Sequence, residues 1–401
     1  MKVDVAIIGA GIIGLTAALE IARSTPRARI VVLEKERDIA THQSGHNSGV
    51  IHSGIYYKPG TLKSRLCKAG AAEMLSFVRE NGIPHQVCGK LIIATRPEQV
   101  HLLDGLFECG SAIGLKGLRK VGPTELTDIE PLSVGIRALH IPSAAVTDYR
   151  MVCEKIADML RQREVAIVNG VEILHVKVSG ASVHLLAREI EVEAGKVINC
   201  AGLQSDRVAR LAGSKPPIRI VPFRGEYFEV AHKPAALVRG LIYPAPDPTL
   251  PFLGVHLTRQ VNGRVSAGPN AVLALSREGY HRLSIRPTDV LELITSLSVW
   301  KMAARNWQVG VEEMYRSLST RQFVESVQQL TPALRSEDLF RNGSGVRAQA
   351  IEKDGSFSDD FRFLRDGPVL HVLNVPSPAA TAAFAIARVV ASKAGINTGP
   401  S

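Results

Sequence analysis

The sequence has few aromatic residues, few cysteines and no long apolar segment. Aromatic residues make up 5% of its 401 residues, and no run approaches the 18 or so consecutive apolar residues that a membrane-spanning helix needs. The five cysteines are dispersed, without a Cys-x-x-Cys pair or histidines at metal-ligand spacing. We therefore expect reduced thiols and no structural metal. An apolar strand begins almost at Met1, which leaves no room for a targeting peptide and predicts a cytoplasmic location in a prokaryote.

Positive charge is in excess but is not concentrated anywhere. The chain has 48 Lys and Arg against 38 Asp and Glu, a formal net charge of +10. Such a balance is typical of proteins that bind nucleic acid, an anionic membrane surface or an acidic substrate. The sequence contains no dense Lys/Arg tract and no basic face with interleaved aromatics, so nucleic acid is the least favoured of the three. An acidic substrate and a peripheral contact with the inner face of the cell membrane both stay open.

The first 34 residues contain a strand, a glycine turn, a helix and a second strand. The apolar run Lys2–Ile8 leads into Gly9-Ala-Gly11-Ile-Ile-Gly14, helical spacing follows, and Ile30–Leu33 ends at Glu34. This order is typical of a dinucleotide-binding βαβ unit.

Each part of this unit has a physical role. Gly9 permits the tight turn, Gly11 lets the backbone approach a pyrophosphate, and Gly14 lets helix and strand pack closely. The pyrophosphate is expected on the free N–H groups at the start of the helix. Glu34 can accept hydrogen bonds from a ribose diol, and its charge opposes a 2′-phosphate, which favours FAD or NAD over NADP.

Two later segments favour FAD. A polar, glycine-containing run, Thr41–Gly49, is followed by Val50–Tyr57, and such a loop can lie along an extended cofactor. An apolar strand then ends at Ile198-Asn-Cys-Ala-Gly202, where small residues allow close backbone contact with the cofactor. We therefore predict an α/β fold in which a Rossmann-like FAD-binding domain is interleaved with a sheet-based substrate domain. The expected boundaries are 1–85, 149–215 and 336–401 for the FAD-binding domain, and 86–148 and 216–335 for the substrate-binding cap.

Several motifs spread over nearly the whole chain carry a family resemblance. They are His46–Tyr57, Pro222–Tyr227, Leu253–Arg259, Gly268–Ala271, Gly345–Gln349 and Asn374–Thr381. On these motifs the chain resembles the D-amino-acid-oxidase-type family of FAD-dependent oxidoreductases, and within it the enzymes that oxidise L-2-hydroxyglutarate. The resemblance implies hydride transfer from Cα of L-2-hydroxyglutarate to flavin N5, which forms 2-oxoglutarate. Electrons are then expected to pass to a membrane quinone or to oxygen. The sequence does not choose between these acceptors or fix the oligomeric state.

That chemistry needs a base and cationic anchors. His52 is our candidate base, because an imidazole near its ordinary pKa of about 6.5 suits proton abstraction at neutral pH. Arg347 is our candidate carboxylate clamp, with His256 as a further catalytic residue. Tyr57, Arg224 and Arg259 are candidate substrate anchors. His256 and Arg259 fall on opposite faces of a regular strand, so both could reach one ligand only across a bend.

The final motif is predicted to open the last helix. Ser377 is a natural N-cap, and the helix N-terminus could stabilise negative charge on the flavin. The residues expected to contact FAD are Gly9, Gly11, Gly14, Glu34, Lys35, Ser44, Asn47, Ser48, Gly49, Val50, Ala201, Gly202, Ser377, Pro378, Ala379, Ala380 and Thr381.

Two other functions stay open. An amino-acid or sarcosine-type FAD oxidase would share the fold, although the need for two anion anchors favours a diacid. A non-catalytic FAD-binding assembly protein would keep the fold without turnover, and the presence of His52 and Arg347 argues against it.

Overall fold

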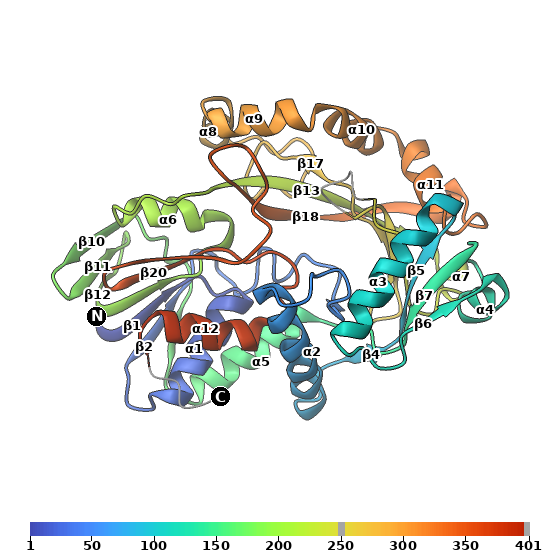
Figure 1. Ribbon diagram of the computed structural model, residues 1–401. Coiled ribbons are helices and arrows are strands. Elements are labelled where there is room, and N and C mark those ends of the chain that lie inside the picture. Colours follow the sequence, from blue (N-terminus) through green and yellow to red (C-terminus); the bar gives the residue numbers. More distant parts are fainter. Residues whose placement is uncertain (248–252, 397–401) are drawn as a thin grey trace.

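The computed structural model describes residues 1–247 and 253–396, whose strands form two large sheets and one small one (Figure 1). Within these residues the first sheet has eight strands: β1 (Lys2–Ile8), β2 (Ile30–Leu33), β9 (Ala166–Val168), β10 (His175–Ser179), β11 (Ser182–Leu186), β12 (Glu191–Asn199), β19 (Arg362–Asp366) and β20 (Val369–Asn374).

The centre of the first sheet is parallel, in the order β20, β12, β1, β2, β9. Ile8 at the end of β1 is paired with Leu33 at the end of β2, so Gly9 and Glu34 follow at the same edge. Helix α1 (Ile12–Ser24) runs back from that edge with its small and aliphatic residues buried. It packs with α5 (Tyr149–Arg161) and α12 (Ala383–Lys393) on one face of the sheet, as Figure 1 shows. The predicted βαβ unit is therefore present.

The second sheet is assembled from two separate parts of the chain. In the described residues its nine strands are β5 (Lys90–Ala94), β6 (Arg119–Val121), β7 (Arg137–Ile141), β13 (Arg219–Val230), β14 (Leu241–Pro244), β15 (His256–Arg259), β16 (Val265–Gly268), β17 (Val272–Leu273) and β18 (Leu339–Ile351). Strand β5 lies parallel to β14 and thereby joins the two parts. The α/β fold with an interleaved second sheet is as predicted.

One predicted boundary is wrong. The chain was expected to return to the FAD-binding domain at residue 336, but β18 is antiparallel to β13 from Leu339 opposite Val230 to Ile351 opposite Arg219. Residues 339–351 therefore belong to the second sheet. The polar residues Arg341, Asn342 and Ser344 and two glycines interrupt the apolar pattern of this segment, so the sequence does not specify the sheet that it joins.

A small sheet and the remaining helices connect and cover the two large sheets. The small sheet contains β3 (Val50–Ile51), β4 (His85–Val87) and β8 (Ala145–Thr147). The other helices are α2 (Leu62–Glu80), α3 (Val100–Ala112), α4 (Pro123–Ile129), α6 (Ser205–Leu211), α7 (His232–Ala235), α8 (Pro287–Ile294), α9 (Leu297–Arg305), α10 (Trp307–Leu318) and α11 (Thr320–Gln328), with short 3₁₀ turns at Pro97–Gln99, Gly202–Gln204 and Ser336–Asp338. No helix among the described residues has both the length and the apolarity needed to cross a bilayer.

Candidate active site

A cavity of about 1190 Å³ runs from the carboxyl edge of the first sheet to the face of the second sheet. This volume exceeds the ~300–1,000 Å³ of an ordinary small-molecule pocket, which leaves room for a dinucleotide and a small substrate together. Of the predicted site residues, the lining includes Gly9, Gly11, Glu34, Lys35, Ser44, Asn47, Ser48, Val50, His52, Tyr57, Ala201, Gly202, His256, Arg347, Ser377, Pro378, Ala379, Ala380 and Thr381. Gly14, Gly49, Arg224 and Arg259 are not part of it.

The glycine turn at the nucleotide end leaves no room for side chains. Gly9 has φ +104°, and a Cβ there would lie 2.6 Å from the carbonyl oxygen of Cys200. A Cβ at Gly14 would lie 2.0 Å from the carbonyl oxygen of Gly9, so Gly14 serves helix–strand contact rather than lining the cavity. Gly11 faces the cavity as the N-cap residue of α1 and has no side chain of its own to cap the helix. The turn therefore presents backbone to an incoming pyrophosphate.

Glu34 is buried beside this turn and held by the backbone. One carboxylate oxygen accepts a 2.7 Å hydrogen bond from Ala10 N–H, and the other accepts one of 3.0 Å from Glu36 N–H. Each oxygen keeps a lone pair for a ribose hydroxyl. The carboxylate is therefore oriented before a nucleotide binds.

Lys35 lines the cavity within a compact charge cluster. Its ammonium group bonds to Glu36 and lies 3.0 Å from the Glu278 carboxylate. Potential metal-ligating atoms of Glu36, His42 and Glu278 lie within 4.8 Å of one another. The ammonium of Lys35 supplies the positive charge that a cation would otherwise bring.

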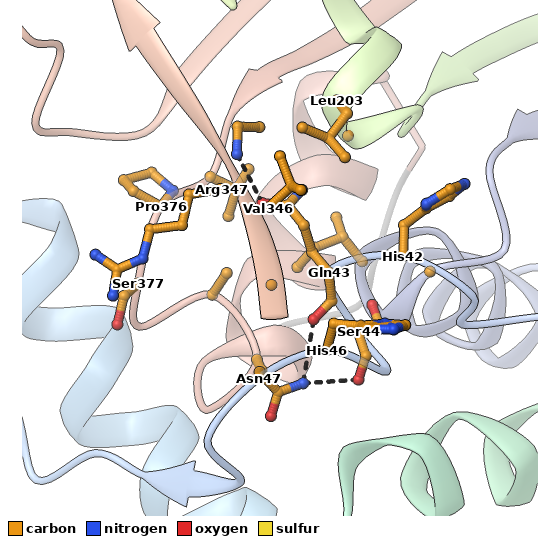
Figure 2. A pocket seen from close by; sticks show the side chains of 18 of the residues that line it. His42, Gln43, Ser44, His46, Asn47, Leu203, Val346, Arg347, Pro376 and Ser377 are labelled. Atoms are coloured by element: carbon orange, nitrogen blue, oxygen red, sulfur yellow. Dashed lines mark hydrogen bonds between the residues drawn. The ribbon is translucent and has the colours of Figure 1, made fainter. Parts of the chain in front are cut away.

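The predicted loop before β3 is held by its own polar side chains. Ser44 Oγ accepts a 2.9 Å hydrogen bond from Ile12 N–H at the start of α1. The Asn47 amide donates to the carbonyl oxygens of Gln43 (3.1 Å) and Ser44 (2.7 Å), as Figure 2 shows. Gly49 has φ +70° and lies against Thr147, so it shapes the turn instead of facing the cavity.

The predicted N-cap at Ser377 is wrong. Helix α12 begins only at Ala383, and its N-cap residue, Ala382, makes no side-chain capping bond. The Ser377 hydroxyl instead lies 3.4 Å from His52 Nε2 and 3.5 Å from the Tyr57 hydroxyl. Ser377 therefore contacts side chains from residues 52–57, whereas a capping serine would accept a hydrogen bond from a backbone N–H of its own helix.

The two candidate catalytic histidines are neutral at physiological pH. Burial, reinforced by the charges of Lys90, His256, Arg347 and Lys63, lowers the pKa of His52 to about 3. This overturns the expectation of an ordinary imidazole. Burial likewise lowers the pKa of His256 to about 3, and its Nδ1 lies 2.9 Å from the Gly254 carbonyl oxygen. Because a carbonyl only accepts, Nδ1 carries the proton and Nε2 is left as an acceptor.

Basic and tyrosine side chains gather at this inner end. Arg347 is on β18, and Figure 2 shows it on the same side of the pocket as Ser377, away from His42. Lys63 lines the cavity and donates 2.9 Å to the Asp359 carbonyl oxygen. The lining also includes five of the seven tyrosines of the chain: Tyr56, Tyr57, Tyr149, Tyr227 and Tyr243. The sequence reasoning missed Lys63 and most of these tyrosines, as well as the buried Lys90.

Arg224 and Arg259, predicted as substrate anchors, are turned away from the cavity. Gly225 and Tyr227 of β13 line it, so alternation along the strand directs Arg224 to the other face, where it pairs with Glu226 at 3.2 Å. Arg259 donates to the Val238 carbonyl oxygen at 2.8 Å, while His256 on the same strand lines the cavity. Alternation along these strands was the sequence signal that could have shown both arginines to face away from the cavity.

The cavity fits FAD. Glycine backbone, an oriented acidic residue and a helix N-terminus meet at one end, and the Thr41–Gly49 loop and the Ala201–Gly202 turn border the path toward His52. An adenosine, a pyrophosphate and a flat ring system need these features in this order.

Comparison with known proteins gives the family. Residues 4–393 match the FAD dependent oxidoreductase family. The chain is 41% identical over 391 residues to L-2-hydroxyglutarate dehydrogenase of Indibacter alkaliphilus, covering 97% of this chain and 98% of that protein. It is 39% identical over 407 residues to the human mitochondrial L-2-hydroxyglutarate dehydrogenase, covering 97% and 88%.

Solved structures share the fold at lower identity. L-alpha-glycerophosphate oxidase from Mycoplasma pneumoniae, with FAD bound, superimposes with a TM-score of 0.80 at 20% identity, covering 99% of this chain and 96% of that chain. Glycine oxidase from Geobacillus kaustophilus gives 0.73 at 16% identity, covering 98% and 95%. The chain therefore belongs to the FAD-dependent oxidoreductase family, in which it groups with the L-2-hydroxyglutarate dehydrogenases, and its cofactor is FAD.

Proposed function

We propose that this enzyme oxidises the Cα–OH of L-2-hydroxyglutarate to give 2-oxoglutarate. The observation that carries the proposal is the group of cations at the inner end of the cavity: Lys63 and Arg347 line it, and Lys90 lies close enough to lower the pKa of His52. A dianionic substrate needs such a positive surrounding. The names of the relatives support the same substrate. FAD, when bound, supplies the acceptor for the hydride.

The residues of the chain account for the other requirements. Arg347 offers a planar guanidinium that can hold a carboxylate through two parallel hydrogen bonds. His52, neutral above about pH 4, can accept the hydroxyl proton at Nε2 as the hydride leaves. Burial and, to a lesser extent, the surrounding cations make this imidazole a weak base in the free protein; two substrate carboxylates would offset the cations and raise its pKa. We further propose that the first sheet and its helices hold FAD, while the second sheet presents His256 and Arg347 to the substrate.

The test is anaerobic mixing of the purified FAD-loaded protein with L-2-hydroxyglutarate, its D-enantiomer and a panel of amino acids. Flavin absorbance near ~450 nm reports reduction. We expect bleaching by the L-hydroxy acid alone. Bleaching by glycine, sarcosine or another amino acid instead would establish the oxidase alternative. If none of these compounds bleaches the flavin although FAD is still bound, a non-catalytic protein is favoured.

For the electron acceptor we propose a membrane quinone, reached through the surface formed by residues 283–318, here called the α8–α10 surface. Both tryptophans of the chain are exposed there, Trp300 by 60% and Trp307 by 62%. The other exposed large apolar residues on it are Leu283, Ile285, Leu291, Ile294, Leu297, Val311, Met314, Tyr315 and Leu318. Figure 1 shows α8, α9 and α10 in a row along one side of the molecule.

The composition of this surface favours lipid over water. Tryptophan and tyrosine concentrate at bilayer interfaces, and amphipathic helices insert their apolar face there. Lys301 is exposed on the same surface and forms no ion pair among the described residues, so it is available to anionic headgroups. The net charge of +10 also favours binding to a membrane of anionic lipids.

Sedimentation with phosphatidylglycerol-containing vesicles tests this proposal. The wild type should bind, and the double variant Trp300→Ser with Trp307→Ser should lose most binding. Val178→Ser, which removes an exposed apolar residue of β10, is the matched control and should bind as the wild type does. Equal sedimentation of both variants would contradict the assignment, as would a concentration-dependent dimer that dissociates on the tryptophan substitutions.

A further inference from the structure

Lys90 is a buried lysine on the cavity-facing side of the second sheet. It begins β5, is only 4% exposed, and has its ammonium 3.5 Å from the ring centroid of Tyr243 and 4.5 Å from that of Tyr56. Tyr243 stacks in turn on His256, with ring centroids 3.9 Å apart. Tyr56, Tyr243 and His256 all line the cavity, so the Lys90 ammonium lies directly against its aromatic wall.

The Lys90 ammonium has no anionic partner among the described residues. It forms no ion pair and donates no hydrogen bond there, and only the two ring faces approach it. Tyr56 presents one of these rings, and its hydroxyl is buried and also lacks a hydrogen-bond partner among the described residues. Buried charges and hydroxyls are ordinarily paired because their desolvation is costly. An unpaired ammonium against the ring of a lining tyrosine whose own hydroxyl is unpaired points to an anionic ligand.

Arg347 is on a different strand of the second sheet from Lys90. It lies on β18, whereas Lys90 lies on β5, and β13, β16, β15 and β14 are between them in the strand order. Both cations nevertheless lie close enough to His52 and His256 to lower the pKa values of these imidazoles. Two cations thus approach the reacting position from different strands, as the two carboxylates of one small diacid require.

We propose that the Lys90 ammonium and the Tyr56 hydroxyl form the subsite for the substrate carboxylate remote from the oxidised carbon, while Arg347 holds the carboxylate next to it. This subsite rests on the proposed function and adds the selection of dicarboxylates over monocarboxylates. Tyr243 is a positioning residue, because its ring lies between Lys90 and the His256 imidazole.

Calorimetric titration of the FAD-loaded protein with glutarate and with butyrate tests the subsite. Glutarate has both carboxylates but no hydroxyl, so its binding is measured without turnover. The wild type should bind glutarate more tightly than butyrate. Lys90→Met retains the apolar stem and should lose ~10–100-fold in glutarate affinity, the effect of a lost charged hydrogen bond, with butyrate affinity within about twofold.

The controls separate this subsite from folding and from the reaction itself. Lys120→Met removes an exposed lysine from β6 of the same sheet and should leave both affinities unchanged. Tyr56→Phe removes only the unpaired hydroxyl and should also weaken glutarate more than butyrate. This second variant keeps the test decisive if Lys90→Met fails to retain FAD.

The possible outcomes are distinct. Equal losses for glutarate and butyrate in Tyr56→Phe and Lys90→Met, or unchanged glutarate binding, would overturn the subsite. If the wild type selects glutarate through Lys90 but is not reduced by L-2-hydroxyglutarate, the subsite stands and the proposed substrate fails. If it is reduced by L-2-hydroxyglutarate while Lys90→Met binds glutarate normally, the reaction stands and the subsite fails.

Discussion

The side-chain oxygen of Thr381 accepts a 3.0 Å hydrogen bond from the backbone N–H of His52. The same oxygen lies 3.1 Å from the Tyr149 hydroxyl and 3.3 Å from the Val50 carbonyl oxygen. Thr381 is buried, so these contacts fix the candidate base to the turn before α12. Residues remote in sequence are thereby held in one rigid corner of the cavity.

Thr381→Val should therefore destabilise the protein and impair its reaction. Loss of the hydroxyl leaves the His52 N–H and the Tyr149 hydroxyl without this partner, which costs ~1–3 kcal/mol. Thermal unfolding of the apoprotein and the rate of flavin reduction measure the two effects. Thr381→Ser keeps the oxygen and should behave nearly as the wild type; equal losses in both variants would exclude the hydrogen bonds as the cause.

His52→Ala should lower the rate of flavin reduction by ~10²–10⁴-fold, the usual contribution of a positioned base. FAD should remain bound, since the residues at the nucleotide end are untouched. His256→Phe preserves a ring against Tyr243 and should reduce the rate less. Stopped-flow measurement of flavin reduction in both variants decides which histidine is the base. A larger loss of rate in His256→Phe would assign that role to His256 Nε2.

The pH dependence of kcat/KM should have an alkaline limb, where activity falls as pH rises, and no acidic limb from the titration of a histidine near pH 6.5. Burial lowers the pKa of Lys90 to about 7, so its ammonium, and with it the affinity for a diacid, is lost as pH rises through that value. His52 and His256 have pKa values of about 3 and stay neutral throughout. Profiles of the wild type and Lys90→Met check this, since the alkaline limb should disappear in the variant. An unchanged limb would assign it to another group.

Arg347→Lys should weaken substrate binding by ~10-fold or more, because an ammonium cannot reproduce the two parallel hydrogen bonds of a guanidinium. The contrasting variant is Arg224→Met, which removes an arginine paired with Glu226 outside the cavity. It should lower thermal stability while KM stays unchanged. A raised KM in Arg224→Met would restore the original assignment of that residue to substrate binding.

Gly70→Ala should be destabilising, whereas Gly105→Ala should be neutral or stabilising. Both glycines are inside helices, but a Cβ at Gly70 would lie 2.5 Å from Ala382 Cα and 2.9 Å from the Thr381 carbonyl oxygen, and one at Gly105 meets nothing within 4 Å. Overpacking at Gly70 costs ~1–3 kcal/mol, and alanine at Gly105 gains up to ~1 kcal/mol of helix propensity. Chemical denaturation measures both, and similar changes would contradict the packing argument.

The sequence alone was enough to predict the glycine turn and the acidic residue that the structure places at one end of the cavity. Gly9, Gly11 and Glu34 follow directly from strands β1 and β2, and a strand, a tight turn and a helix are specified by residues close together in the chain. Later segments extended this reasoning to FAD, which the comparisons confirm, and to an interleaved second sheet, which the pairing of β5 with β14 confirms. The roles of His52, His256 and Arg347 stay predictions.

Only the tertiary structure decided what the remaining polar residues do. Arg224 and Arg259 looked like anchors, and Ser377 looked like a cap, because a sequence shows a side chain's chemistry but not its neighbours. Lys90 opens an otherwise apolar strand, yet its burial depends on Tyr243, about 150 residues later. Strand pairing between distant segments sets which face each residue occupies, and that pairing created both the unpaired ammonium of Lys90 and the inner cavity beside it.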